Sequence, residues 1–262
     1  MKIPFYHVDA FTDRIFKGNP AAVCLLADWL PDATMQNIAY ENNLSETAFV
    51  VGNKGQYQIR WFTPTTEVEF CGHATLASAH ILFAELGEPS DHISFQGKIG
   101  TLTVSQHGDA LQLSGPAIPS DPITVPEALK NHLKENLVAT LANPIQDFIV
   151  VTNNQEVVES VTAEITTMVP EEYRGVIVTS TGISCDFVSR WFGIDVGVIE
   201  DPFTGSAHCQ LAPYWSQKLG KTNLTAVQLS QRQGHCTVNL EGDTVHLIGK
   251  AKTYCCGFIT IN

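Results

Sequence analysis

The chain has 262 residues and a formal net charge of −12 at pH 7, with 44% hydrophobic and 16% charged residues. This composition is typical of a globular protein with one or two domains and excludes a largely disordered chain. The acidic balance disfavours nucleic acid and anionic membrane surfaces as partners, because both require a basic protein face. The sequence contains no apolar run long enough for a membrane span and no signal-peptide core after Met1, so we expect a cytoplasmic protein.

The seven cysteines are an odd number and form no CxxC pair. We therefore expect neither a disulfide framework nor a zinc ribbon, and most thiols should be reduced and buried. Neighbouring residues on a strand or helix point in different directions, so adjacent pairs do not suit one tetrahedral metal ion. The sequence accordingly predicts no metal site, neither at the pairs His208-Cys209, His235-Cys236 and Cys255-Cys256 nor at His73 and His80, which lie two turns apart on one helix.

In the first half of the chain, helical signals predict helices over residues 31–43 and 73–86. Runs rich in β-branched and aromatic residues predict strands over residues 48–51, 57–62, 101–104 and 110–113. Turn residues separate these strands at positions 53–55 and 107–109. A proline-rich stretch over residues 116–122 interrupts both patterns, and we place the crossing between two domains there.

In the second half, the sequence predicts helices over residues 128–141, 184–192 and 206–219. A hairpin is predicted from residues 236–240 and 244–248, joined by a turn at 241–243. Each half thus contains one long, mostly apolar helix. Because such a helix must be enclosed on most sides, we expect antiparallel strands to wrap around it.

A short pattern occurs twice, about half the chain apart. Arg60-Trp61-Phe62 precedes a helical run from Gly72 to Gly87, and Arg190-Trp191-Phe192 precedes a run from Gly205 to Gly220. The two runs agree without gaps at the opening glycine, at two alanines and at the closing Leu-Gly. Two copies of one unit would bring two helix N-termini, which favour bound anions, to a shared cleft.

Three short stretches carry the candidate chemistry. Glu46 follows the end of a predicted helix, His73 lies beside Gly72 at the start of the next, and Asp201 precedes the start of a later one. Position alone fits a structural role as well as a chemical one for each of them. Glu46 could be a solvated turn residue, His73 a buried hydrogen-bonding histidine and Asp201 a helix cap or turn residue. A helix N-terminus should lower the basicity of His73 and favour its neutral form.

Neighbours of these residues complete the candidate site. Ser206 could cap the second helix or hold a ligand carboxylate, and Phe203 could form a pocket wall. Cys71 could act as a nucleophile beside His73, although a small buried thiol is the commoner outcome. No dinucleotide or phosphate-binding loop motif is present.

At these residues the chain resembles the PhzF-like phenazine-biosynthesis family, over nearly its whole length. The opening of the family is matched by Val8-Asp9-Ala10-Phe11-Thr12, Phe16-Lys17-Gly18-Asn19-Pro20-Ala21-Ala22-Val23, Met35-Gln36-Asn37-Ile38-Ala39 and Ser45-Glu46-Thr47. Its later signatures are matched by Phe62-Thr63-Pro64, Cys71-Gly72-His73-Ala74-Thr75, Glu200-Asp201-Pro202, Thr204-Gly205-Ser206-Ala207-His208 and the set Gln228, Ser230, Arg232 and Gly234. This ordered set is far more specific than any single motif.

The resemblance implies an α+β protein with the diaminopimelate-epimerase-like fold, in which two similar domains are each a mostly antiparallel β roll around a central helix, with the site between them. The expected domains are residues 1–116, with the central helix at about 73–87 and completed by the tail at about 252–262, and residues 117–251, with the central helix at about 206–220. It also implies a possible homodimer, for which the sequence shows no interface.

The resemblance further implies a site without a cofactor. Glu46 corresponds to the proton-moving carboxylate, assisted by His73 and Asp201, and the substrate-holding set corresponds to Ser45, Gly72, Gly205 and Ser206. Related epimerases and racemases use two cysteines, whereas Asp201-Pro202 stands in the second motif of this chain. At Gln233 and Phe203 many relatives carry smaller residues, which leaves the substrate open.

We therefore expect an isomerase that moves a proton, and with it a double bond, within a small carboxylate-bearing metabolite. Such a reaction needs a positioned base and fixed donors for the enolate or carboxylate that forms. Two alternatives remain at this stage. One is an amino-acid epimerase or racemase, and the other is a non-catalytic member that binds metabolites or partner proteins.

Overall fold

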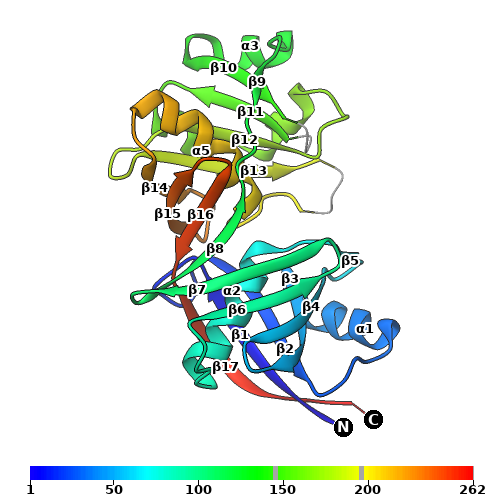
Figure 1. Ribbon diagram of the computed structural model, residues 1–262. Coiled ribbons are helices and arrows are strands. Elements are labelled where there is room, and N and C mark those ends of the chain that lie inside the picture. The colour runs from blue at the N-terminus through cyan, green and yellow to red at the C-terminus, as the bar shows by residue number, and fades with distance from the viewer. Residues whose placement is uncertain (144–146, 195–197, 262) are drawn as a thin grey trace. The chain divides into compact units, whose positions relative to one another are not determined.

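The computed structural model describes residues 1–143, 147–194 and 198–261. The chain divides into two compact units, which are described separately (Figure 1). The first unit comprises Met1–Ser114 and Ile248–Asn262, and the second comprises Gly115–Leu247. The sequence prediction had divided the chain at residues 116 and 252.

The first unit consists mainly of strands with one enclosed helix. Its elements are β1 (Lys2–Ala10), β2 (Asn19–Leu26), α1 (Asp32–Asn42), β3 (Glu46–Asn53), β4 (Gln56–Phe62), β5 (Glu67–Val68), α2 (Gly72–His80), the π-helical turn η1 (Ile81–Glu85), β6 (His92–Gly97), β7 (Gly100–His107), β8 (Ala110–Pro116) and β17 (Ala251–Thr260). The last strand pairs antiparallel with the first, from Lys2 opposite Thr260 to Ala10 opposite Ala251. The two ends of the chain therefore lie together on this unit (Figure 1).

Helix α2 is the central helix of the first unit. It contacts β1, β2, β3, β7 and β17, and every residue from Gly72 to Ala79 is buried. Small side chains such as Ala74, Ala77 and Ala79 allow strands to approach it closely. A helix with this composition gains most of its stability from enclosure, as predicted, because it has no polar face to present to water.

The second unit repeats this plan. They are β9 (Asp121–Pro122), α3 (Glu127–Leu133), the 3₁₀ turn η2 (Lys134–Asn136), β10 (Leu137–Ala142), β11 (Asp147–Thr152), α4 (Gln155–Ser160), the 3₁₀ turn η3 (Ala163–Met168), β12 (Gly175–Thr181), β13 (Phe187–Gly193), α5 (Gly205–Leu219), β14 (Asn223–Gln228), β15 (Gly234–Glu241) and β16 (Thr244–Gly249). Its apolar core is built around Phe148, Val176 and Phe192.

Strand pairing follows the same sequence of directions in both units. In the first, β1–β2 is antiparallel, β2–β3 parallel, β3–β4 antiparallel and β4–β6 parallel. In the second, β10–β11, β11–β12, β12–β13 and β13–β14 follow the same order. The central helix enters at the same point, before β6 in one unit and before β14 in the other. The sequence repeat is therefore a repeat of topology.

The repeated arginines make matching contacts. Arg60 forms two hydrogen bonds to Glu67, with Nε at 2.7 Å and Nη2 at 2.8 Å from the carboxylate oxygens. Arg190 forms the same pair with Glu200, at 2.6 and 3.0 Å. Each guanidinium also lies over the ring of the phenylalanine two residues later, at 5.2 Å in the first unit and 4.8 Å in the second. The correspondence thus extends to Glu67 and Glu200, which sequence comparison had not paired.

Three of the predicted helices are confirmed, one is wrong and one is correct only in its first half. Residues 31–43, 73–86 and 206–219 correspond to α1, α2 with η1, and α5. Residues 184–192 instead contain β13, which lies between β12 and β14 and is buried on both faces. A strand of that kind shows no alternation of polar and apolar residues, so periodicity does not distinguish it from a buried helix.

The predicted helix over residues 128–141 is correct only in its first half. Helix α3 ends at Leu133, Lys134 has a positive φ of 52°, and Leu137–Ala142 pairs with β11 as strand β10. Val138 and Thr140 favour extended backbone, and neither glycine nor proline marks the change. The predicted strands and the hairpin around residues 241–243 are confirmed as parts of longer strands.

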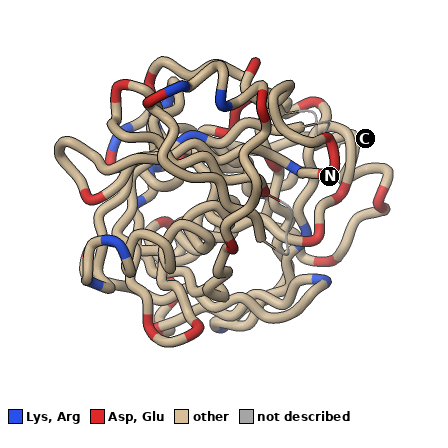
Figure 2. Tube along the Cα trace, turned by 90° about the horizontal axis from the view of Figure 1, so that it is seen from above, with Lys and Arg blue, Asp and Glu red and all other residues tan. Residues whose placement is uncertain are grey.

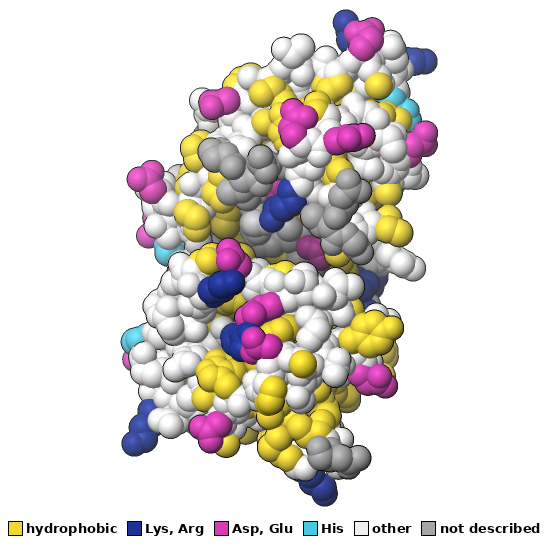
Figure 3. Space-filling view, turned by 90° about the vertical axis from the view of Figure 1, so that its right-hand side faces the viewer, with side chains coloured by type: hydrophobic (Ala, Val, Ile, Leu, Met, Phe, Trp, Pro, Cys, Tyr) yellow, Lys and Arg dark blue, Asp and Glu magenta, His cyan; other side chains and the backbone are white. Residues whose placement is uncertain are grey.

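Charged residues are distributed over both units. In Figure 2 the acidic positions are spread along the trace and not concentrated in one segment. Figure 3 shows acidic and basic side chains in contact on one face. None of the helices in the described part of the chain combines the length and apolar character needed to cross a membrane.

Candidate functional site

Glu46 and His73 are brought together in the first unit. Glu46 is the first residue of β3 and His73 the second residue of α2, and their Oε2 and Nε2 atoms lie 3.0 Å apart. The His73 side chain is 7% exposed and that of Glu46 is 19% exposed. Oε2 itself is buried, so the exposed part of Glu46 belongs to the rest of its side chain.

Asn19 holds the opposite side of the imidazole. It is the first residue of β2, which runs parallel to β3, so the starts of both strands lie at one edge. Its Nδ2 is 3.2 Å from Nδ1 of His73. An amide can present either an N–H or an oxygen to the ring, and therefore supports both protonation states of the histidine.

Cys71 is the third side chain at His73. It occupies the N-cap position of α2, and its Sγ lies 3.5 Å from Nδ1 and 4.0 Å from Nε2. Its backbone carbonyl accepts hydrogen bonds from both the amide and the hydroxyl of Thr75. These bonds fix the turn that presents the thiol to the ring.

The protonation state of His73 differs from the neutral form that the sequence predicted. Burial opposes the charged imidazolium, but the neighbouring Cys71 sulfur and Glu46 carboxylate outweigh it and raise the pKa of His73 well above its ordinary value. The predicted neutral form is therefore wrong in direction, because a helix N-terminus acts more weakly than a carboxylate at 3.0 Å. Burial raises the pKa of the Cys71 thiol to about 11, so the thiol is protonated near neutral pH.

The other two predicted residues of the first unit flank this pair. Ser45 precedes Glu46 and is half-buried. Gly72 is the first residue of α2, and a Cβ there would lie 3.4 Å from Leu113. The first amide groups of a helix have no intrahelical partner and can receive a substrate oxygen.

In the second unit, Asp201 organises the start of α5. Its carboxylate accepts a hydrogen bond of 2.5 Å from the hydroxyl of Thr204, the N-cap residue. The backbone of Asp201 bonds to Trp191 and to the buried side chain of Gln228. Gln228 also accepts the Thr204 amide. Asp201 therefore has the turn role that its position in the sequence suggested. A chemical role is compatible with these contacts.

Ser206 does not cap α5, contrary to one of the sequence expectations. It is the second residue of the helix, after Gly205, and its hydroxyl accepts a 3.2 Å hydrogen bond from Arg174. Arg174 is itself paired through two nitrogens with the fully buried carboxylate of Asp147, which also accepts from Gln210. Because the charge of Arg174 is offset by Asp147, the groups that could receive an anionic group here are the Ser206 hydroxyl and the N-terminus of α5.

Phe203 is not a pocket wall. Its side chain is fully buried, stacks on His208 with ring centroids 4.4 Å apart, and fills the space next to Gly234. Burial lowers the pKa of His208 to about 4, so this histidine is a neutral core residue. The phenylalanine was assigned to a pocket because the sequence shows only that it precedes a helix start.

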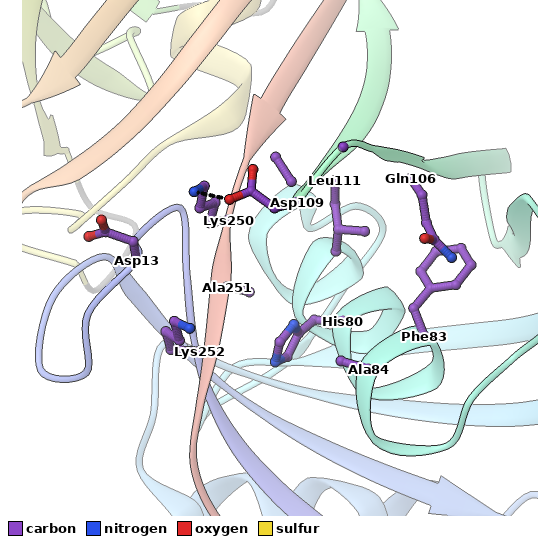
Figure 4. A pocket seen from close by; sticks show the side chains of 12 residues that line it. Asp13, His80, Phe83, Ala84, Gln106, Asp109, Leu111, Lys250, Ala251 and Lys252 are labelled. Atoms are coloured by element: carbon purple, nitrogen blue, oxygen red, sulfur yellow. Dashed lines mark hydrogen bonds and ion pairs between the residues drawn. The ribbon is translucent and has the colours of Figure 1, made fainter.

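A separate pocket of about 540 Å³ lies in the first unit (Figure 4). Its lining includes none of the predicted site residues; it is formed by Asp13, His80, Phe83, Ala84, Gln106, Gly108, Asp109, Ala110, Leu111, Lys250, Ala251 and Lys252. Lys250 and Asp109 form an ion pair across it. Two aspartates offset the two lysines, so the pocket has no clear preference for a charged ligand.

Sequence reasoning missed Asn19, Arg174 and Asp147 as functional candidates. Asn19 carried one usable signal, because it belongs to the Gly18-Asn19-Pro20 segment that opens a strand. Arg174 and Asp147 carried none, since their pairing depends on the parallel register of β11 and β12.

Comparisons with known proteins agree with this architecture. Residues 8–257 match the model of the phenazine biosynthesis-like protein family. An uncharacterized isomerase of Pseudomonas aeruginosa is 45% identical over 257 residues, covering 98% of each chain. The crystal structure of a PhzF-family phenazine biosynthesis protein of Enterococcus faecalis is 40% identical, covers 100% of both chains and has a TM-score of 0.94.

A more distant structure extends the likeness of fold. A hydroxyproline epimerase of Agrobacterium vitis has a TM-score of 0.61 at 10% identity, covering 98% of this chain and 91% of its own. The predicted fold class, an epimerase-like pair of β rolls, is thereby confirmed. Together with the family match over residues 8–257 and the 45% identity to its relative, these findings show that the chain belongs to the phenazine biosynthesis-like protein family.

Proposed function

We propose that this protein is an isomerase that moves a proton within a small carboxylate-bearing metabolite, with Glu46 as the general acid and base. The observation that carries the proposal is the contact of Glu46 Oε2 with His73 Nε2 at 3.0 Å, at the start of a buried helix. The relatives named isomerases support the reaction class.

The reaction is a shift of one proton and one double bond. The Glu46 carboxylate removes a proton from a carbon of the substrate, the electron pair moves into the conjugated system, and Glu46 returns the proton to another carbon. His73, charged by its raised pKa, holds Oε2 of Glu46 and balances its charge in both steps. The free amide groups at Gly72 and His73 stabilise the enolate that forms between them.

We include Asp201, Gly205 and Ser206 in the proposed site. Ser206, held by Arg174, and the amide at Gly205 would bind the substrate carboxylate, and Asp201 would assist by fixing Thr204 at the start of α5. The resemblance to the family and the position of Ser206 in the first turn of α5 support this assignment. A Ser206→Ala variant should raise KM with little change in kcat.

Racemisation by two thiols is not supported. The Cys71 thiol has a pKa of about 11 and is protonated near neutral pH. Thr204, the N-cap residue of α5, stands where Cys71 stands at α2. The second cysteine that such a reaction requires, one thiolate acting as base and one thiol as acid, is therefore replaced by a hydroxyl hydrogen-bonded to Asp201.

The test is a screen of unsaturated and cyclic carboxylic and amino acids for solvent deuterium uptake, followed by NMR. With a substrate in hand, Glu46→Gln should lower kcat by about 100-fold to 10,000-fold, the usual contribution of a general base. Glu69→Gln is the matched control, because Glu69 is 63% exposed and pairs only peripherally with Lys98 at 3.4 Å. Full turnover in a folded Glu46→Gln protein would remove Glu46 from the mechanism.

A further inference from the structure

Glu46, Cys71 and His73 together form a three-ligand cluster that the adjacent His-Cys pairs of the sequence did not reveal. Their carboxylate oxygen, sulfur and imidazole nitrogen atoms lie within 4.8 Å of one another. The residues come from two elements, the start of β3 and the start of α2. Thiolate, imidazole and carboxylate are the three ligand types that Zn²⁺ accepts, and three protein ligands with one open position is a common zinc arrangement.

We propose that this cluster binds a thiophilic divalent cation, with Zn²⁺ as the best-fitting ion, and that the bound ion switches the isomerase off. The inhibitory part rests on the proposed function, because it assumes that Glu46 must be free to carry protons. Binding of the ion itself does not depend on that function.

The separation of His73 Nε2 and Glu46 Oε2, 3.0 Å, is close to the roughly 3.4 Å expected between nitrogen and oxygen ligands of a tetrahedral Zn²⁺ ion. The Cys71 sulfur lies nearer to Nδ1 of His73, at 3.5 Å, than to Nε2, at 4.0 Å. To reach an ion bound at Nε2, the Cys71 thiol must therefore rotate about its Cα–Cβ bond.

The surroundings supply the outer shell that a metal-bound histidine needs. With the ion on Nε2, the Nδ1–H of His73 donates to the Asn19 amide at 3.2 Å once that amide presents its oxygen. The N-cap turn holds Cys71 through Thr75. The partly exposed Glu46 side chain gives the ion a route into an otherwise buried site.

Charge balance also favours the ion. A Zn²⁺ ion bound by a thiolate, a carboxylate and a neutral imidazole forms a complex with no net charge, because the two anionic ligands offset the ion. The protons that the ion displaces from its ligands pass to water. A buried site tolerates such a complex, because no net charge enters it.

The experiment uses Co²⁺ as a spectroscopic probe and Zn²⁺ as the inhibitor, on the full chain after treatment with a chelator. Because Cys255 and Cys256 are exposed and could bind metal themselves, the reference protein carries Cys255→Ser and Cys256→Ser. In that background, one equivalent of Co²⁺ should produce a sulfur-to-cobalt charge-transfer band. Cys71→Ser should abolish the band and weaken Zn²⁺ binding by at least about 100-fold.

The outcomes separate the two parts of the proposal. A band that persists after Cys71→Ser, or the absence of a band in the reference protein, overturns the metal site. If the band is lost in Cys71→Ser, intact far-ultraviolet circular dichroism of the variant shows that unfolding is not the cause of the loss. If one equivalent of Zn²⁺ binds through Cys71 while deuterium exchange into substrate continues, the inhibitory part is overturned. If the protein binds the metal but isomerises none of the acids screened, the result counts against the proposed function and supports the metal site.

Discussion

Replacing Glu46 with glutamine should change how the stability of the protein depends on pH. In the wild type the folded-state pKa of His73 is raised, with burial opposed by the Cys71 sulfur and the Glu46 carboxylate. A histidine raised in this way stabilises the fold fully below its unfolded pKa of about 6.5, and this contribution is lost as pH rises through the folded pKa. Above about pH 6.5 the folded state binds more protons than the unfolded state.

The slope of the free energy of unfolding against pH follows from the one proton that His73 binds. Between the two pKa values, the free energy of unfolding should fall by up to about 1.4 kcal/mol for each pH unit. Glu46→Gln removes the carboxylate charge at 3.0 Å, so the pKa of His73 falls and this slope flattens. The amide is nearly the same size, and the variant should remain folded.

The other histidines and cysteines whose pKa values are clearly shifted change protonation outside the pH range in which the slope is measured. The pKa values of His80 and His208 are lowered by burial, so their contributions change below about pH 6.5. The buried cysteines have raised pKa values and act only above about pH 8.5, where unfolded thiols ionise. Urea unfolding at several pH values between these limits, with Glu69→Gln as control, measures the slope. Equal slopes in the wild type and in Glu46→Gln would refute the coupling of Glu46 to His73.

Three further predictions concern the scaffold that presents the site. Phe203→Ala should lower the free energy of unfolding by about 3–5 kcal/mol, because it removes a fully buried ring stacked on His208; urea denaturation measures this, and a loss below about 1 kcal/mol would contradict the packing. Gly234→Ala should destabilise by about 1–3 kcal/mol, since its Cβ would lie 2.4 Å from Phe203; a combined variant with Phe203→Leu should recover part of the loss. Glu200→Gln should lower the free energy of unfolding by about 1 kcal/mol more than Glu67→Gln does. Without Glu67, Arg60 still pairs with Asp32 at 2.8 Å, whereas the more buried Arg190, without Glu200, keeps backbone carbonyls as its partners among the described residues. Equal losses in thermal unfolding would show that these backbone carbonyls are sufficient partners for Arg190.

The sequence predicted the parts of the fold that local pattern determines. The central helices were recognisable because an apolar run follows a glycine and ends at Leu-Gly, with Gly220 adopting the left-handed cap. Strand β13 and strand β10 were predicted as helix, because their conformation is imposed by neighbours such as β12 and β11. Pairing with a partner far along the chain leaves no local signal when both faces of a strand are buried.

The same limit applied to the candidate site. Glu46 and His73 could be selected from residue type and position, but their contact depends on the parallel alignment of β2 and β3 and on the turn at Cys71. The raised pKa of His73 comes from Cys71, two residues earlier, and from Glu46, which is 27 positions earlier in the sequence but 3.0 Å away in space. The contribution of Glu46 has no signal in the local sequence. Asn19 was missed for the same reason.

The repeat shows why the contact between Glu46 and His73 has no counterpart in the second unit. By strand register, Gly175 at the start of β12 stands where Glu46 stands at the start of β3. A Cβ at Gly175 would lie 2.4 Å from Trp191, so the second unit has no room for a carboxylate at that position. Ser206 replaces His73 as the second residue of the central helix and is held by Arg174. The two copies have therefore diverged: the first unit holds the contact between Glu46 and His73, and the second has a glycine and a serine at the corresponding positions.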